Sequence, residues 1–179
     1  MYYSTTYESP LGILTLCCDE KNLVGLWLTE QKYSESFVDK QAAEREDMSV
    51  FHTVRQWLDR YFAREKIGIE GIPLAPQGSD FRQQVWKILC EIPYGEVITY
   101  GEIAERIAQQ RGVPKMSAQA VGGAVGHNPI SIIIPCHRVV GANGNLTGYG
   151  GGIEKKIQLL TLEGLDMSKF YIPKKGTAL

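Results

Sequence analysis

The chain has 179 residues, of which 44% are hydrophobic and 22% charged, with a mean hydropathy of −0.16. This composition excludes disordered, collagen-like and repeat-array proteins, and the length accommodates one medium domain or two small ones. No apolar run approaches the ~20 residues of a membrane span and no secretory signal is visible, so we expect a cytoplasmic protein. The net charge of −1 is unevenly divided: residues 1–79 hold 8 Lys/Arg and 12 Asp/Glu, whereas residues 80–179 hold 11 and 8. The second part, at +3, is therefore the one suited to a phosphate backbone.

The first segment predicts an α/β arrangement. Residues 11–18 and 23–29 are strand-like runs joined by four polar residues, which indicates an antiparallel hairpin. Residues 31–47 are polar and predict a loop or an irregular helix. Apolar side chains recur at helical spacing in residues 49–65. Glycine and proline then break the pattern, and we place a domain boundary near residues 73–79.

The second segment predicts three helices. Ser79 can cap the first, Thr99-x-x-Glu102 is a capping box for the second, and Ser117 can cap a third over residues 118–126. The third helix is nearly free of large side chains, and its two internal glycines each cost about 1 kcal/mol relative to alanine. Its backbone can therefore be approached closely. Tight packing against another helix explains this pattern, and so does insertion into a nucleic-acid groove as part of a helix-turn-helix.

The four cysteines have no spacing typical of a zinc site, so we predict no bound metal. Cys17, Cys18 and Cys90 are interpreted as structural thiols, and a disulfide framework is not expected in a reducing cytosol.

Cys136 differs from the other cysteines because of its neighbours. Residues 132–134 predict a buried strand that Pro135 ends, which would hold the thiol at the floor of a cleft. His137 and Arg138 follow directly, and a base or cation near a thiol raises the fraction of nucleophilic thiolate. A buried cysteine beside a hydrogen-bonded histidine explains the same pair without any chemistry, and the residues alone leave both interpretations open.

Two features follow the cysteine. Residues 141–152 contain six glycines, which predicts a mobile loop that could cover a pocket and offer backbone N–H groups to a ligand. Residues 154–163 predict an amphipathic helix, with Thr161 on its apolar side, that Gly164 ends. Glu163 then falls in the last turn, where the helix dipole disfavours an anion. It is either part of a site or an exposed glutamate that costs little.

The segment Ile134-Pro135-Cys136-His137-Arg138-Val139 resembles the active-site signature of the O6-alkylguanine-DNA alkyltransferases, which are also called the methylated-DNA–protein-cysteine methyltransferase family. The resemblance extends over residues 81–163, about half of the chain. Further matching segments occur in the family's order: Gly95-Glu96-Val97-Ile98-Thr99-Tyr100, Ala120-Val121-Gly122-Gly123-Ala124, Asn128-Pro129, Tyr149 and Glu163-Gly164.

This resemblance implies an α+β protein. Residues 1–75 would form a small ribonuclease H-like α/β domain with an antiparallel sheet. Residues 76–170 would form a mainly helical DNA-binding and alkyl-transfer domain that contains the helix-turn-helix, and residues 171–179 a flexible tail.

The resemblance also implies a mechanism without a cofactor. Cys136 would take the alkyl group from O6 of a guanine flipped out of double-stranded DNA, in a single-turnover reaction of a monomeric protein. His137, reached through a water, would act as the base, with Glu163 holding its tautomer. Asn128 would brace the turn and its hydrogen bonds. Tyr100 would help rotate the nucleotide and donate its hydroxyl to N3 of the guanine.

The residues implied to contact DNA lie on the third helix, after the cysteine and in the glycine-rich loop. They are Ser117, Gln119, Ala120, Gly122, Gly123, Arg138, Val139, Tyr149, Gly150 and Gly151. The third helix would enter the minor groove, and the carbonyls of Cys136 and Val139 would read the exocyclic amine. Two residues depart from the family. Gln119 stands where an arginine finger is usual, which predicts weaker DNA affinity or base flipping, and Gly150 stands where some relatives carry a serine, so no side chain can act there.

Two other functions are considered. Alkyltransferase-like relatives bind the lesion without repairing it, but they replace the cysteine that is intact here. A thiol hydrolase using cysteine, histidine and glutamate would turn over repeatedly, and no second feature of the sequence supports it.

Overall fold

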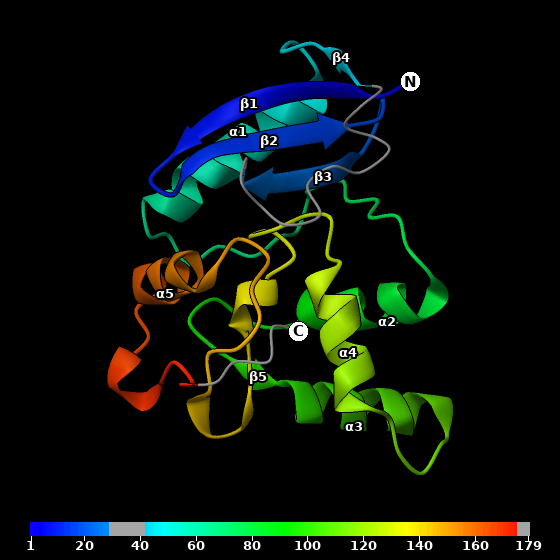
Figure 1. Ribbon diagram of the computed structural model, residues 1–179. Coiled ribbons are helices and arrows are strands. Elements are labelled where there is room, and N and C mark those ends of the chain that lie inside the picture. The colour runs from blue at the N-terminus through cyan, green and yellow to red at the C-terminus, as the bar shows by residue number, and fades with distance from the viewer. Residues whose placement is uncertain (29–41, 175–179) are drawn as a thin grey trace. The chain divides into compact units, whose positions relative to one another are not determined.

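The computed structural model describes residues 1–28 and 42–174 (Figure 1). Thr29 of the expected second strand, most of the polar stretch 31–47 and the end of the expected tail lie outside these residues. None of the helices in the described ranges is long and apolar enough to cross a membrane.

The chain divides into two compact units, each of which is described by itself. The first contains Met1–Gln77 together with Pro129–Ile133, and the second contains Gly78–Asn128 together with the chain from Ile134 onward.

The first unit is built on a four-stranded mixed sheet. Its strands are β1 (Tyr3–Ser9), β2 (Gly12–Cys18), β3 (Leu23–Leu28) and β4 (Ala43–Glu44), in the order β3-β2-β1-β4. The expected hairpin is confirmed as the antiparallel pair β2–β3, with Leu16 opposite Leu26. β1 also pairs antiparallel with β2, but it pairs parallel with β4. The sheet is therefore mixed rather than purely antiparallel.

One helix, α1 (Ser49–Phe62), packs against β1 and β2 (Figure 1). Its buried face consists of Val50, Phe51, Val54, Trp57, Leu58 and Tyr61, whereas Phe62, which the helical spacing also placed there, is half-buried. Trp57 Nε1 donates to the carbonyl of Gly68 at 2.7 Å, which anchors the irregular chain after the helix. Cys17 and Cys18 are fully buried in this unit, as expected of structural thiols.

The second unit is mainly helical, with α2 (Asp80–Leu89), α3 (Tyr100–Arg111) and α4 (Ala118–Gly126) starting at the three predicted caps. The complete capping box is present at α3, where the Thr99 side chain accepts from the Glu102 N–H and the Glu102 carboxylate from the Thr99 N–H. α4 packs against both α2 and α3. Trp86 Nε1 donates to the carbonyl of Ala124 at 2.8 Å, which ties α2 to α4.

A short parallel pair brings distant residues together in this unit. β5 (Ile98–Thr99) pairs with β6 (Val139–Val140), Ile98 lying opposite Val139. Because β5 leads directly into α3, the pair sets the first residue of that helix beside the chain that follows the cysteine motif. The last long helix, α5 (Ile153–Leu162), ends at Glu163.

The segment Pro129–Ile133 returns to the sheet of the first unit. Leu26 of β3 donates its N–H to the carbonyl of Pro129 at 2.9 Å and accepts from the N–H of Ser131 at 2.8 Å. The sequence placed these residues in the second domain because five residues carry no compositional signal of their own. Their partners belong instead to the first unit.

The strand expected at residues 132–134 is wrong. The three isoleucines are buried, but they form a turn in which Ile132 has a φ of +70°, a value that β-branched residues rarely adopt. The Ile133 N–H donates to the Ser131 carbonyl and the Cys136 N–H to the Ile134 carbonyl, each at 2.8 Å. These bonds span two residues each, so the chain is coiled tightly before the cysteine rather than extended.

Backbone hydrogen bonds connect the first part of the glycine-rich stretch to the chain near Tyr171. The Gly141 N–H donates to the Asn145 carbonyl at 2.7 Å. Tyr171, the first residue of the expected tail, donates to the Gly144 carbonyl at 3.0 Å and accepts from the Leu146 N–H at 2.9 Å. The chain is therefore held by backbone hydrogen bonds as far as Tyr171.

Candidate active site

Cys136 opens a single 3₁₀ turn, η2 (Cys136–Arg138), and its side chain is buried, with 6% of the residue exposed. Burial raises the pKa of the thiol above its usual range. Three influences oppose that rise: a hydrogen bond with the Asn128 side chain, the charge of Lys156, and the N–H groups of Cys136 and His137. These influences favour the thiolate but offset burial only in part, because the net shift of the thiol pKa is upward.

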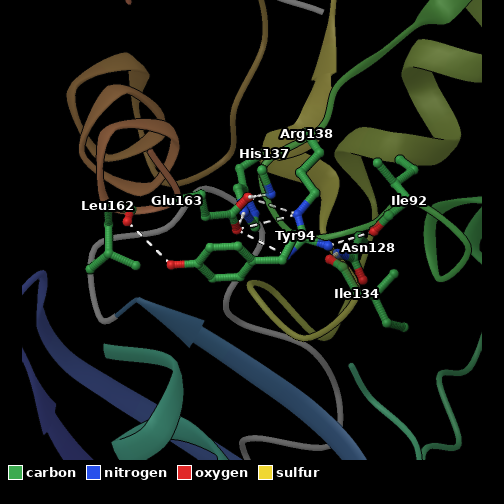
Figure 2. A network of polar contacts seen from close by, with 9 residues as sticks. Ile92, Tyr94, Asn128, Ile134, His137, Arg138, Leu162 and Glu163 are labelled. Carbon is green, nitrogen blue, oxygen red and sulfur yellow. Dashed lines mark hydrogen bonds and ion pairs between the residues drawn. The ribbon is translucent and has the colours of Figure 1, made fainter. Parts of the chain in front are cut away.

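Asn128 braces the turn that carries the thiol. It is buried, and its Nδ2 donates to the carbonyl of Ile134 at 2.8 Å (Figure 2). Ile134 is the residue whose carbonyl also accepts the N–H of Cys136. One side chain therefore fixes the backbone immediately before the cysteine, which is the bracing role that the resemblance implied.

His137 is fully buried, and its Nε2 lies 2.7 Å from Glu163 Oε1. A carboxylate only accepts, so the shared hydrogen belongs to Nε2 and the basic nitrogen of the neutral ring is Nδ1. Burial lowers the pKa of His137, although the hydrogen bond and charge of Glu163 oppose this. The histidine is therefore neutral at pH 7 and suited to accept a proton.

Glu163 ends α5 and is 4% exposed, so the interpretation of an exposed glutamate is wrong. Its Oε2 accepts from Arg138 Nε at 2.9 Å and from the Gly95 N–H at 3.2 Å, and its Oε1 accepts from Arg138 Nη2 at 2.9 Å. Burial raises the pKa of the carboxyl, but its contacts with His137 and Arg138 outweigh burial and lower the pKa to about 2. The unfavourable helix end is thus compensated by a full positive charge.

Arg138 does not lie where a DNA contact was expected. The residue is 6% exposed, and its guanidinium points inward (Figure 2). Nε and Nη2 donate to Glu163, Nη1 donates to the carbonyl of Ile92 at 2.6 Å, and the guanidinium carbon lies 5.9 Å from the centre of the Tyr94 ring. The donors of Arg138 are therefore directed to Glu163 and Ile92 inside the unit, and its side chain is not presented to DNA as the resemblance implied.

Tyr100, the first residue of α3, is buried and lies against the glycine-rich loop. Its hydroxyl donates to the carbonyls of Thr147 and Gly148 at 3.3 and 3.4 Å. Burial and the negative charge of a Cys136 thiolate raise its pKa, so the hydroxyl keeps its proton. Tyr100 and Cys136 are thus close enough to interact electrostatically.

Lys156 of α5 is a functional candidate that the sequence analysis missed. It is fully buried, and its Nζ donates to the carbonyls of Val139 at 2.5 Å and Thr147 at 3.0 Å. Burial lowers its pKa to about 8, against the opposing influence of Cys136. The helical spacing could have predicted its burial, because Lys156 lies three and four residues before the buried Leu159 and Leu160 and so shares their face. Thr161, which was expected on the apolar side, is exposed.

The carbonyl of Val139 was expected to read the exocyclic amine of the base. It already accepts from the Lys156 ammonium.

The short helix α4 has one buried and one open face. Ser117 caps it by accepting from the Ala120 N–H at 3.2 Å. Gln119, Ala120 and Gly123 are exposed, and a Cβ added at Gly123 would meet nothing within 4 Å. The opposite face is buried and consists of Val121, Gly122, Ala124 and Val125. Both interpretations of the small residues are therefore compatible with the helix, because one face packs and the other is free.

Tyr149, Gly150 and Gly151 form the turn that leads into α5, and all three are half-buried. The Gly152 N–H donates to the carbonyl of Tyr149 at 2.9 Å. Burial raises the pKa of Tyr149, and negative charge on Cys136 and Glu163 raises it further. Tyr149 is thus within electrostatic range of both, which suits a residue at the wall of the site.

Comparison with known proteins covers nearly the whole chain. Residues 1–76 match the ribonuclease-like domain of 6-O-methylguanine DNA methyltransferase, and residues 80–165 match its DNA-binding domain. Curated relatives named methylated-DNA–protein-cysteine methyltransferase include those of Haemophilus influenzae, 44% identical, and Mycobacterium tuberculosis, 47% identical. The first alignment covers 90% of this chain and 86% of the relative, and the second 91% and 93%.

Solved structures agree with this assignment. The O6-methylguanine methyltransferase of M. tuberculosis superposes with a TM-score of 0.77 at 46% identity, covering 91% of this chain and 93% of that one. A structure of M. tuberculosis OGT in complex with DNA has the same TM-score and covers 94% of both chains at 46% identity. The chain therefore belongs to the methylated-DNA–protein-cysteine methyltransferase family.

Proposed function

We propose that this protein repairs DNA by transferring a methyl group from O6 of guanine to its own Cys136. The observation that carries the proposal is the buried Cys136 on a turn braced by Asn128 and followed by the His137–Glu163 pair. Family membership over both domains supplies the substrate class, since the relatives are named for methylated DNA. The target atom lies inside the duplex, so the base must be flipped out to meet a buried thiol.

The proposed chemistry balances without a cofactor. His137 Nδ1 takes the proton of the Cys136 thiol through a water, and Glu163 holds the resulting imidazolium. The thiolate attacks the methyl carbon, forming an S–C bond while the C–O6 bond breaks. The electron pair passes to the guanine, and Tyr100, whose hydroxyl keeps its proton, donates a hydrogen bond to N3. The guanine anion then takes up one proton from water and His137 releases one to water, so that neutral guanine and a neutral imidazole remain. The product is a thioether that none of these side chains can cleave, so each molecule acts once.

The DNA-binding side of the proposal rests on α4. Its exposed face, which carries Gln119, Ala120 and Gly123 after the capping Ser117, is small enough to enter the minor groove of double-stranded DNA. Gly122 would let the backbone pack closely behind that face, and Tyr149 to Gly151 would wall the base pocket. We propose a monomer acting in the cytoplasm, which agrees with four cysteines that are all free thiols.

A mass measurement tests the proposal directly. After incubation with a duplex containing one O6-methylguanine, the protein should gain the mass of one methyl group, located on the peptide that contains Cys136. Cys136→Ala should bind the duplex without gaining mass, and Cys90→Ala, the matched control, should react like the parent. Repeated turnover, or a methyl group on Cys90, would refute the assignment.

The second candidate function is lesion binding without transfer. The intact Cys136 argues against it, because such relatives lack that thiol. Tight binding of the methylated duplex by a protein whose mass stays unchanged would favour this alternative.

A further inference from the structure

Arg138 makes the most extensive charged contact in the network of Figure 2. Its Nε and Nη2 face the two carboxylate oxygens of Glu163 in a fork, at 2.9 Å each, and its Nη1 is anchored on the carbonyl of Ile92. A fork of this kind fixes a carboxylate in position and orientation more firmly than a single donor does. The mechanism proposed above assigns this buried guanidinium no role.

The arginine shares its carboxylate with the histidine. Glu163 Oε1 accepts from His137 Nε2 at 2.7 Å and from Arg138 Nη2 at 2.9 Å. A buried carboxylate whose only charged partner was an imidazole would favour a proton on that imidazole, because a pair of opposite charges is more stable there than a lone anion. A protonated His137 could not accept the proton of a thiol. The guanidinium satisfies the carboxylate and so removes the reason to protonate the ring.

We propose that Arg138 is a positioning residue for alkyl transfer, whose fork on Glu163 neutralises and fixes that carboxylate so that His137 stays a neutral base. The inference rests on the proposed function, since it concerns the same thiol and the same base. It differs from the role that the resemblance implied, in which Arg138 would contact DNA.

Several charged or titratable groups face His137 and must be considered together. Glu163 at the end of α5 favours the protonated ring, whereas Arg138 on the same turn and Lys156 of α5 both disfavour it. Cys136, the neighbour in the turn, would favour it once ionised. Replacing the guanidinium by an uncharged side chain should therefore raise the pKa of His137, and the neutral base should then be available only at higher pH.

The first experiment measures the single-turnover transfer rate to an O6-methylguanine duplex between pH 5.5 and 9. In Arg138→Met the acid limb of the profile should move to higher pH by about one to three units, the range produced by one nearby charge. Arg138→Lys keeps the charge and should leave the limb near its original position at a lower maximal rate. The double variant Arg138→Met/Glu163→Gln removes both charges and should bring the limb back toward the parent, even if the single variant folds poorly.

A second measurement is independent of DNA. Nuclear magnetic resonance of labelled imidazoles gives the pKa of each histidine, and the chain has three, so His52 and His127 are internal controls. Arg138→Met should raise the pKa of His137 alone. An unchanged pKa and an unmoved limb would overturn the inference.

The remaining outcomes separate the alternatives. Weaker duplex binding by Arg138→Met with an unmoved limb would restore the DNA-contact role. Equal slowing at every pH would reduce Arg138 to a structural residue and also overturn the inference. A parent protein that transfers no methyl group would sink the proposed function itself, whereas the imidazole titration would still test the effect of Arg138 on His137.

Discussion

The proposed site has two parts, the surroundings of Cys136 and the exposed face of α4, and they differ in how they use charge. Around Cys136, one histidine and three charged side chains are buried: His137, Arg138, Glu163 and Lys156. The exposed face of α4, by contrast, carries no charged side chain. The first half depends on buried charges, whose electrostatic interactions are strong because the local dielectric constant is low. The second half depends on small side chains that leave the helix backbone accessible.

Because of this difference, the two halves should respond to different substitutions and solution conditions. Buried charges that compensate one another respond to pH and to removal of a single partner, because the other partner is then left uncompensated. A helix face without charge neutralises no phosphate, so its DNA binding depends little on salt but responds to an added positive charge.

The largest effect is expected from Glu163→Gln, which leaves Arg138 buried without its anion. Breaking a buried pair in this way costs about 3–5 kcal/mol in the free energy of unfolding, measured by urea denaturation at pH 7. The pKa of Glu163, about 2, lies below its ordinary value of 4.5. The stability it contributes is thus present above pH 4.5 and is lost as the pH falls toward 2. The variant should lack this part of the acid dependence.

Glu154→Gln is the matched control, since it makes the same change on an exposed residue in the first turn of the same helix. Its free energy of unfolding should stay within about 0.5 kcal/mol of the parent. Equal effects of the two substitutions would show that the Glu163 pair contributes nothing special to stability.

A smaller effect is expected from Lys156→Met, which removes the cation near the thiol and frees the carbonyls of Val139 and Thr147. The pKa of Cys136 should rise, and the single-turnover transfer rate at pH 7 should fall by about tenfold, equivalent to one pKa unit. Because the pKa of Lys156 is about 8, its ammonium is lost above that pH and the deficit should narrow there. Lys155→Met is the control, and a deficit that is constant with pH would argue against an electrostatic role.

The smallest effect concerns the uncharged half. Gln119→Arg adds one positive charge to the exposed face of α4, and we expect duplex affinity to increase several-fold, with one more phosphate contact in the salt dependence. The repair rate should rise with it. Gln158→Arg adds the same charge on α5 as a control. Unchanged or lower affinity and rate for Gln119→Arg would contradict the idea that glutamine at this position limits binding or flipping.

Local patterns predicted those parts of the fold that local physics decides. The caps at Ser79, Thr99 and Ser117 fixed three helix starts, because each side chain satisfies N–H groups within three residues of itself. The hairpin β2–β3 followed from alternating apolar runs and a polar turn. The resemblance around Cys136 supplied the family.

Other parts needed partners that are far away in the sequence. The turn before Cys136 was mistaken for a strand because three isoleucines favour a strand locally. Instead, the hydrogen bonds of Pro129 and Ser131 with β3 hold the start of this segment against the sheet of the first unit, and the three isoleucines form a turn. Strand β1 was not anticipated, since its residues are a mixture of polar and aromatic types that only the pairing with β2 explains.

The amino-acid sequence was enough for the family, the candidate nucleophile Cys136, the helix starts and the division of charge between the two halves of the chain. The buried positions of Arg138 and Lys156, and the contact of Arg138 with Glu163, were decided only by long-range packing. Each of these residues is of a type that normally faces solvent, and each is buried here because a partner many positions away compensates its charge or fills its hydrogen bonds. Such compensation leaves no local pattern in the sequence. A charged residue is therefore predicted to lie on the surface unless its distant partner is known.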